Sequence, residues 1–189
     1  KVEILIEAEE EIRSRLNEDI EIVIAGTDSP NTPGYLDEMK EKYSHVPQIR
    51  FTGYVAEEDV PKLFGESAVT VFPYTSTTGS SGVLHQAGSY GNAVALPDLG
   101  DLSTLVEEEG YKGEFFEADD TSSLATAIEK ILTNDAYRIQ LGKQNYKAAC
   151  SLPMSAITQM YIDYFKAIQK SKETGFNIDI STIEKKLVH

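Results

Sequence analysis

The stretch from Thr75 to Val94, TSTTGSSGVLHQAGSYGNAV, contains the residues of this chain best suited to hold an anion. Its first eight residues, 75–82, are all Ser, Thr or Gly, and an apolar helical pattern starts directly after them. Gly79 and Gly82 have no Cβ, so backbone N–H groups there can approach a ligand closely. The free N–H groups and positive dipole end of the following helix favour negative charge. Together these parts predict a phosphate cradle.

An ordinary turn explains the same loop, because Ser, Thr and Gly dominate turns and Ser is a frequent N-cap. The loop by itself does not separate the two interpretations. The patterns GxxxxGK[ST] and GxGxxG are both absent, so the P-loop and dinucleotide fingerprints do not apply. Gln86, one turn into the helix, can hydrogen-bond a ribose hydroxyl or belong to a solvated polar face. Its neighbour His85 is most simply a structural residue.

The bulk composition describes one domain of ordinary size. The chain has 189 residues, of which 41% are hydrophobic, which is enough to bury a core. A net charge of -14 argues against binding to nucleic acid or to an anionic membrane, since both need clustered Lys and Arg. The single Cys150 excludes an internal disulfide and favours a reducing compartment, so we expect a cytoplasmic protein.

Helical and strand-like patterns alternate along the chain, which is typical of βαβ units and a parallel sheet. Strands are predicted at 20–26, 48–53, 68–73 and 92–97, with a short edge strand at 113–116. Helices are predicted at 2–16, 35–43, 57–67, 82–90, 102–108, 122–132, 135–147 and 153–170, with Thr121 as the N-cap of the sixth. The fold class is therefore α/β: a Rossmann-like, three-layer αβα domain with a parallel sheet of five to six strands.

The loops after the strands are the candidates for chemistry, because ligands of parallel α/β sheets lie beyond the carboxyl ends of the strands. The chain opens directly on a helix, whereas a doubly wound unit normally begins with a strand. We therefore expect that an N-terminal part is missing. The last helix carries an aromatic side that predicts core or interdomain packing rather than a cofactor site, and the tail from Ser171 shows no clear pattern.

An ordered set of short motifs runs through the chain. They are Ala25-Gly26, Phe51-Thr52-Gly53-Tyr54-Val55, Leu63-Phe64, Ala68, Pro73, Gly79 to Gly82, Gln86-Ala87 and Gly91-Asn92-Ala93-Val94. In this order they resemble the C-terminal domain of retaining glycosyltransferases of the GT-B fold, in the large group that includes glycogen and sucrose synthases. No single motif decides the resemblance, which spans about residues 1–170.

The resemblance implies a donor-binding domain at 1–170, truncated from a two-domain enzyme, and a tail at 171–189. Such an enzyme transfers a sugar from a nucleoside-diphosphate sugar to an acceptor with retention, and the isolated domain would be inactive. The missing N-terminal domain would bind the acceptor, and any peripheral membrane association would run through it. We expect no nucleic-acid partner, no cofactor besides the donor substrate, and no metal, because no DxD-like carboxylate pair stands at a strand end.

The resemblance also assigns site residues. Those facing the transferred sugar, and hence catalytic, are Thr78, Gly79 and Ser80. Those binding the rest of the donor are Gly26, Tyr54, Val55, Ser81, Gly82, Val83, Gln86 and Lys1. Within this set Tyr54 and Val55 would hold the base, Gln86 the ribose and the amides of the 79–83 loop the diphosphate. Lys1 stands for a family lysine that neutralises the diphosphate, and the accompanying arginine is absent.

Two positions depart from the family pattern. The family has two glutamates eight positions apart, which fall here at Thr78 and Gln86. Gln86 can still hydrogen-bond a ribose, but Thr78 supplies no carboxylate. Three alternatives therefore stay open: a non-catalytic nucleotide-binding or regulatory module, a GT-B-type sugar-nucleotide epimerase, and a flavodoxin-like signalling domain. The lack of an acidic cluster after the first strand weighs against the last.

Overall fold

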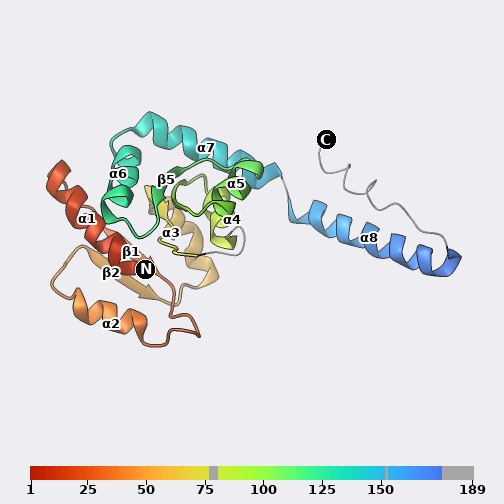
Figure 1. Ribbon diagram of the computed structural model, residues 1–189, viewed down its shortest axis with the longest axis horizontal. Coiled ribbons are helices and arrows are strands. Elements are labelled where there is room, and N and C mark those ends of the chain that lie inside the picture. The colour runs from red at the N-terminus through yellow and green to blue at the C-terminus, as the bar shows by residue number, and fades with distance from the viewer. Residues whose placement is uncertain (77–80, 152, 176–189) are drawn as a thin grey trace. The chain divides into compact units, whose positions relative to one another are not determined.

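The computed structural model describes residues 1–76, 81–151 and 153–175, in which helices and strands alternate (Figure 1). In chain order the elements are α1 (Val2–Leu16), β1 (Ile22–Ala25), α2 (Tyr35–Lys42), β2 (Ile49–Gly53), the 3-10 turn η1 (Glu57–Asp59), α3 (Val60–Glu66), β3 (Val69–Val71), α4 (Gly82–Ser89), β4 (Ala93–Asp98), α5 (Asp101–Glu108), β5 (Glu114–Glu117), α6 (Thr121–Leu132), α7 (Asp135–Ser151) and α8 (Met154–Thr174). The chain forms two compact units, 1–148 and 149–189. The predicted domain limit at residue 170 stays a prediction.

All strand pairs between these elements are parallel, which confirms the α/β class. The five described strands form two hydrogen-bonded sheets, with the orders β1-β2 and β3-β4-β5, where the sequence predicted one sheet. The difference arises because β1 and β3 do not pair with each other. The predicted edge strand is β5, which pairs only with β4.

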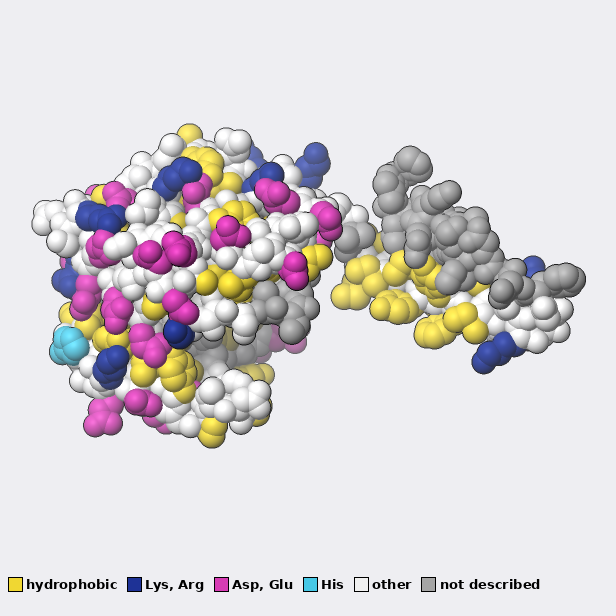
Figure 2. All heavy atoms as spheres, in the orientation of Figure 1, with side chains coloured by type: hydrophobic (Ala, Val, Ile, Leu, Met, Phe, Trp, Pro, Cys, Tyr) yellow, Lys and Arg dark blue, Asp and Glu magenta, His cyan; other side chains and the backbone are white. Residues whose placement is uncertain are grey.

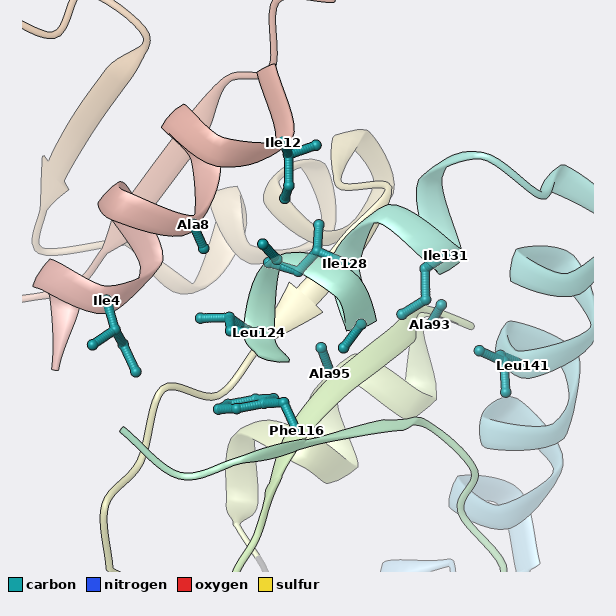
Figure 3. Packing of buried hydrophobic residues seen from close by; sticks show 12 residues of the cluster. Ile4, Ala8, Ile12, Ala93, Ala95, Phe116, Leu124, Ile128, Ile131 and Leu141 are labelled. Atoms are coloured by element: carbon teal, nitrogen blue, oxygen red, sulfur yellow. The ribbon is translucent and has the colours of Figure 1, made fainter. Parts of the chain in front are cut away.

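Strand β4 is the centre of the larger sheet and is buried from Ala93 to Pro97. Ala93 and Ala95 belong to a core formed with α1 and α6 (Figure 3). Because side chains alternate along a strand, Val94 and Leu96 point to the opposite face, where α4 and α5 contact β4. Helices therefore cover both faces of this sheet, as a three-layer αβα arrangement requires.

Helix α1 packs against both sheets. Ile4, Ala8 and Ile12 lie in the core of the larger sheet. Ile6 lies in a second cluster with Ile22 of β1, and Leu5 contacts both clusters. The helical period predicted one apolar face of α1, made of Leu5, Ala8, Ile12 and Leu16. The buried surface of the helix is wider than this face, because α1 also packs against the core of the second sheet.

Two smaller points of the sequence interpretation change. The N-cap of α6 is Asp120 rather than Thr121, because the Asp120 carboxylate accepts the N–H of Ser123 at 2.8 Å while Thr121 is already helical. In the second unit, α8 has no buried side chain among the described residues, and the core or interdomain packing predicted for its aromatic side stays a prediction. Figure 2 shows hydrophobic side chains along this helix. No described helix is long and apolar enough to span a membrane.

The amino end of β4 is fixed by close contact with α7. Asn145 is fully buried, donates to the carbonyl of Asn92 at 2.9 Å and accepts the N–H of Lys112 at 2.8 Å. Beside it, a Cβ added to Gly142 would lie 2.0 Å from the carbonyl oxygen of Gly91. Only glycine therefore allows α7 to approach β4 this closely.

Gly142→Ala is expected to destabilise the protein by about 2 kcal/mol or more, because the clash is with backbone and requires α7 to move. The matched control is Gly65→Ala in α3, where an added Cβ meets nothing within 4 Å. That change should stabilise by about 0.5–1 kcal/mol through helix propensity. Urea unfolding followed by circular dichroism measures both, and equal effects at the two sites would contradict the contact.

A buried carboxylate lies on the inner side of α1. The Glu9 side chain is only 2% exposed, and neither oxygen accepts a hydrogen bond from the described residues. The guanidinium of Arg13 is its ion-pair partner at 3.3 Å. Burial raises the pKa of Glu9 above its usual 4.5, and the attraction of Arg13 only partly offsets this. The folded protein therefore holds this proton more tightly than the unfolded chain does.

Glu9→Gln is expected to raise the free energy of unfolding at pH 7, where the native carboxylate is charged and desolvated. Because the folded pKa is raised, Glu9 favours folding below its unfolded pKa and loses that contribution as the pH rises through the folded pKa. The advantage of the variant should therefore shrink as the pH falls towards 4.5. Chemical denaturation across this pH range measures it, with exposed Glu10→Gln as control; a constant difference would refute the assignment.

Candidate functional site

The ends of β1 and β2 meet through two glycines. Gly26 directly follows β1 and donates its N–H to the carbonyl of Gly53 at 3.0 Å. Both have positive φ, 115° and 66°, a region that glycine enters without strain. Tyr54 follows with its side chain 81% exposed, and Val55 is half-buried. The predicted residues Gly26, Tyr54 and Val55 are thus brought together, and the open tyrosine ring can stack on a planar ligand.

The loop after β1 is ordered by an aspartate that the sequence interpretation did not single out. The carboxylate of Asp28 accepts the N–H of Gly34 at 2.7 Å and that of Leu36 at 2.8 Å. These two bonds tie the loop that follows Gly26 to the start of α2. The sequence signal that could have identified Asp28 is an aspartate at the start of a segment rich in turn residues, since such aspartates commonly accept nearby backbone N–H groups.

The start of α4 presents free backbone donors. Leu84 and His85 donate to the carbonyl of Ser81, while the N–H groups of Gly82 and Val83 have no partner within the described ranges. Ser81 occupies the N-cap position, but its side chain makes no capping bond. Its hydroxyl lies 3.1 Å from that of Tyr74, a contact that nothing in the sequence signalled. The Ser81 side chain therefore does not cap the helix, and among the described residues nothing occupies these donors, which are of the kind that bind anions.

Gln86 and Gly82 lie on the accessible surface of α4. An added Cβ on Gly82 would meet nothing within 4 Å, so the protein itself does not require glycine there. His85, by contrast, contacts other side chains of the protein, with its Nδ1 2.8 Å from the hydroxyl of buried Tyr111. The predicted catalytic residues Thr78, Gly79 and Ser80 lie outside the described residues.

Lys1 lies at the same edge of the larger sheet. Its backbone nitrogen donates to the carbonyl of Pro73, just beyond β3, at 2.8 Å. Its ammonium group is 2.6 Å from the carboxylate of Asp119, which raises the pKa of Lys1 through a hydrogen bond and charge attraction. The next N–H, of Val2, donates to the hydroxyl of Tyr35 at 2.7 Å. The start of α1 thus joins the carboxyl end of β3 to α2, and Lys1 is exposed there.

Apart from the Lys1 ammonium and its partner Asp119, these groups are backbone amides, an aromatic ring and neutral side chains rather than a set of acids and bases. Figure 2 shows acidic side chains spread over the visible face of residues 1–148. Across the described ranges, no group of three His, Cys, Asp or Glu side chains is arranged to hold a metal ion. Donors of this kind bind and orient an anionic ligand.

The sequence model of a family described as "Glycosyl transferases group 1" matches residues 1–134. The chain belongs to this family. A comparison with curated proteins finds no significant match.

Several solved structures share the fold of this chain. Sucrose-phosphate synthase from Thermosynechococcus elongatus has a TM-score of 0.62 at 19% identity, over 84% of this chain and 49% of that one. HepE from Anabaena, in complex with UDP and glucose, has a TM-score of 0.69 at 14% identity, over 85% and 44%. The C-terminal domain of a group 1 family protein, LpcC, from Francisella tularensis has a TM-score of 0.65 at 17% identity, over 79% and 77%. The chain spans about half the length of the first two.

In this group 1 domain, Asp28→Ala is expected to destabilise by about 1–2 kcal/mol, because two loop N–H groups lose a charged acceptor. Faster amide hydrogen exchange at Gly34 and Leu36 should accompany the loss. Asp37→Ala is the matched control, since its carboxylate is 82% exposed and pairs with the exposed Lys40 at 3.1 Å. An unchanged exchange rate at Gly34 would show that Asp28 does not order the loop.

Proposed function

We propose that this domain binds the nucleoside-diphosphate part of a sugar donor for a longer glycosyltransferase. The observation that carries the proposal is the start of α4, where Gly82 and Val83 are exposed and their N–H groups have no partner among the described residues. Membership of the group 1 family supports this use. So do structural relatives described in complex with UDP and a sugar.

Each part of the donor has a suitable partner. The diphosphate would accept hydrogen bonds from Gly82 and Val83, and the helix dipole would favour its charge. The exposed ring of Tyr54 would stack on the base, beside Val55 and Gly26. Gln86, one turn into α4, would hydrogen-bond the ribose, and Lys1 would add positive charge. Ser81 would stay with Tyr74 and hold the loop that leads into the helix.

In the proposed reaction the bond between the anomeric carbon and the diphosphate oxygen breaks, and a bond to an acceptor hydroxyl oxygen forms with retention. The electron pair leaves with the diphosphate, which also takes the acceptor proton. Donors already aimed at the diphosphate stabilise this charge as it develops, which is the electrostatic part of catalysis. Thr78, Gly79 and Ser80 are proposed to face the sugar. No metal is needed in this scheme.

The acceptor is proposed to bind to a further domain, so residues 1–189 alone should bind donor without turning it over. A second candidate is a nucleotide-binding module without catalysis, favoured by the neutral side chain of Gln86 where the family carries a glutamate. The exposed free thiol of Cys150 supports a reducing, cytoplasmic location.

Titration calorimetry with UDP, GDP and their glucose conjugates tests the proposal. Gly82→Val should lower the affinity about tenfold or more by keeping the diphosphate away from the amides, and Gln86→Ala should lower it about fivefold through a lost hydrogen bond. Gly65→Val and Gln140→Ala are matched controls at an equally open glycine and an exposed glutamine. Binding of none of the four compounds would overturn the proposal, as would site variants that bind like the controls.

A further inference from the structure

A groove runs along α7, away from the proposed donor site. Helix α7 passes over the amino ends of β4 and β5, where Gly142 packs against Gly91 and Asn145 accepts the N–H of Lys112 (Figure 1). Between the helix and residues 112–113 lies a groove of about 750 Å³, a volume typical of small-molecule sites. The donor loops follow the carboxyl ends of the strands, so this groove lies at the other end of the larger sheet.

The wall of the groove opposite α7 is held in place by close contacts. Gln144 donates to the carbonyl of Gly110 at 2.8 Å, and the buried Asn145 accepts the N–H of Lys112 at 2.8 Å. Gly113 lies tightly against β4, because an added Cβ would be 2.7 Å from a backbone carbonyl oxygen of that strand. The groove is therefore a packed part of the fold rather than a gap beside a loose loop.

One end of the groove carries positive charge. Lys143 and Lys147 are exposed and stand one turn apart on the same face of α7, and Lys112 lies on the opposite wall. Neither Lys143 nor Lys147 forms an ion pair within the described residues. Lys112 pairs with Glu107 at 3.6 Å, and because both side chains are more than half exposed, that pair is easily exchanged for another anion. In a chain with a net charge of -14, three lysines around one groove attract an anion locally.

The other end of the groove, towards the start of α7, is apolar. Its lining includes Ala136, the half-buried ring of Tyr137 and Ile139, whose side chain is exposed although it is apolar. The one carboxylate beside this end, that of Glu114, pairs with Lys130 at 2.8 Å and accepts the hydroxyl of Tyr137. An apolar surface of this kind favours a hydrocarbon part of a ligand.

We propose that this groove binds a small anionic amphiphile, with its phosphate or carboxylate head at the three lysines and an alkyl chain along the apolar end. The groove follows α7 from Ala136 to Lys147, a length of about 16 Å at 1.5 Å per residue. The aliphatic stems of the lysines extend the apolar surface up to the charged heads. The inference does not depend on donor binding.

Other anionic partners fit the groove less well. An extended acidic peptide would also need hydrogen-bond partners for its own backbone. Two amide side chains of this region are already engaged, since Gln144 donates to Gly110 and Asn145 to Asn92. An alkyl chain needs no such partners. A flat bilayer cannot enter a groove, and the net charge of the chain opposes its approach to an anionic surface.

The test titrates the full chain with octyl phosphate and with octanoate below their micelle concentrations. Chemical shifts of the amides of Gly113, Gln140 and Lys143 report binding in the groove by NMR. Octanol, octyltrimethylammonium and inorganic phosphate are the matched compounds, which lack the charge, reverse it or lack the chain. We expect octyl phosphate to bind at least about tenfold more tightly than each of these three, because both the ion pairs and the buried chain contribute. Added NaCl should weaken its binding.

The double variant Lys143→Gln with Lys147→Gln should lower the affinity for octyl phosphate about tenfold or more, through the loss of two charged partners. Lys40→Gln with Lys62→Gln is the matched control, because it makes the same change of net charge at two exposed lysines of other helices. All four lysines are at the surface, so folding should be unaffected. UDP affinity should be the same in both double variants.

Ile139→Ser should lower the affinity about threefold, because the alkyl chain loses apolar contact area. Ile162→Ser removes an equally exposed apolar side chain from α8 and is its control.

Absence of shifts at the three groove amides would overturn the proposal, as would groove variants that bind like their controls. Equal binding of octanol or octyltrimethylammonium would show that the lysines do not select charge and would also overturn it. Tighter binding of a capped peptide of alternating glutamate and leucine would assign the groove to a protein partner instead. Loss of UDP binding with octyl phosphate still bound would refute the proposed function and leave this inference standing.

Discussion

The packing of α1 across two sheets is the constraint on which the rest of this structure depends. Among the described residues no strand of one sheet pairs with a strand of the other, and Ile4, Leu5 and Ile6 of α1 pack into the cores of both sheets. The start of α1 also hydrogen-bonds the carboxyl end of β3 and, through Tyr35, α2. One helix therefore sets the position of the ends of β1 and β2 relative to the start of α4. These are the parts that would hold opposite ends of a donor.

The proposed binding of a donor at this edge relies on backbone N–H groups rather than on side-chain charge. A chain with a net charge of -14 repels an anion at long range, so attraction has to be local. Amides at the start of α4 would provide it, because those of Gly82 and Val83 have no partner in the part of the chain that the structure describes, while the Ser81 hydroxyl lies beside Tyr74. The ammonium of Lys1 is shared with Asp119 and contributes less than a free lysine would. Membership of the family and the geometry of the start of α4 are thus two separate arguments for the proposed nucleoside-diphosphate ligand.

The site could be predicted from sequence to the extent that local chemistry defines it. Gly26, Tyr54 and Gln86 could be singled out from sequence because glycine pairs and polar residues after apolar strands have local signatures, and their roles in binding stay predictions. Tyr74 was missed, because its partner lies across a loop and no pattern links the two. Asp120 was passed over for Thr121, since both are good N-caps and only the helix start separates them. Thr78, Gly79 and Ser80 stay predictions.

The sequence by itself determined the alternation of elements, the α/β class and the family. Hydrophobic periodicity and turn residues are local properties, so they can be recognised without knowing which residues are in contact in the fold. The tertiary structure alone decided which residues meet. It placed Gly142 against Gly91, buried Glu9 on the inner side of α1, and divided the described strands into two sheets in which β1 and β3 do not pair. Hydrogen bonds between strands and close backbone contacts join residues far apart in the chain. Their presence or absence therefore depends on three-dimensional packing that no local pattern records.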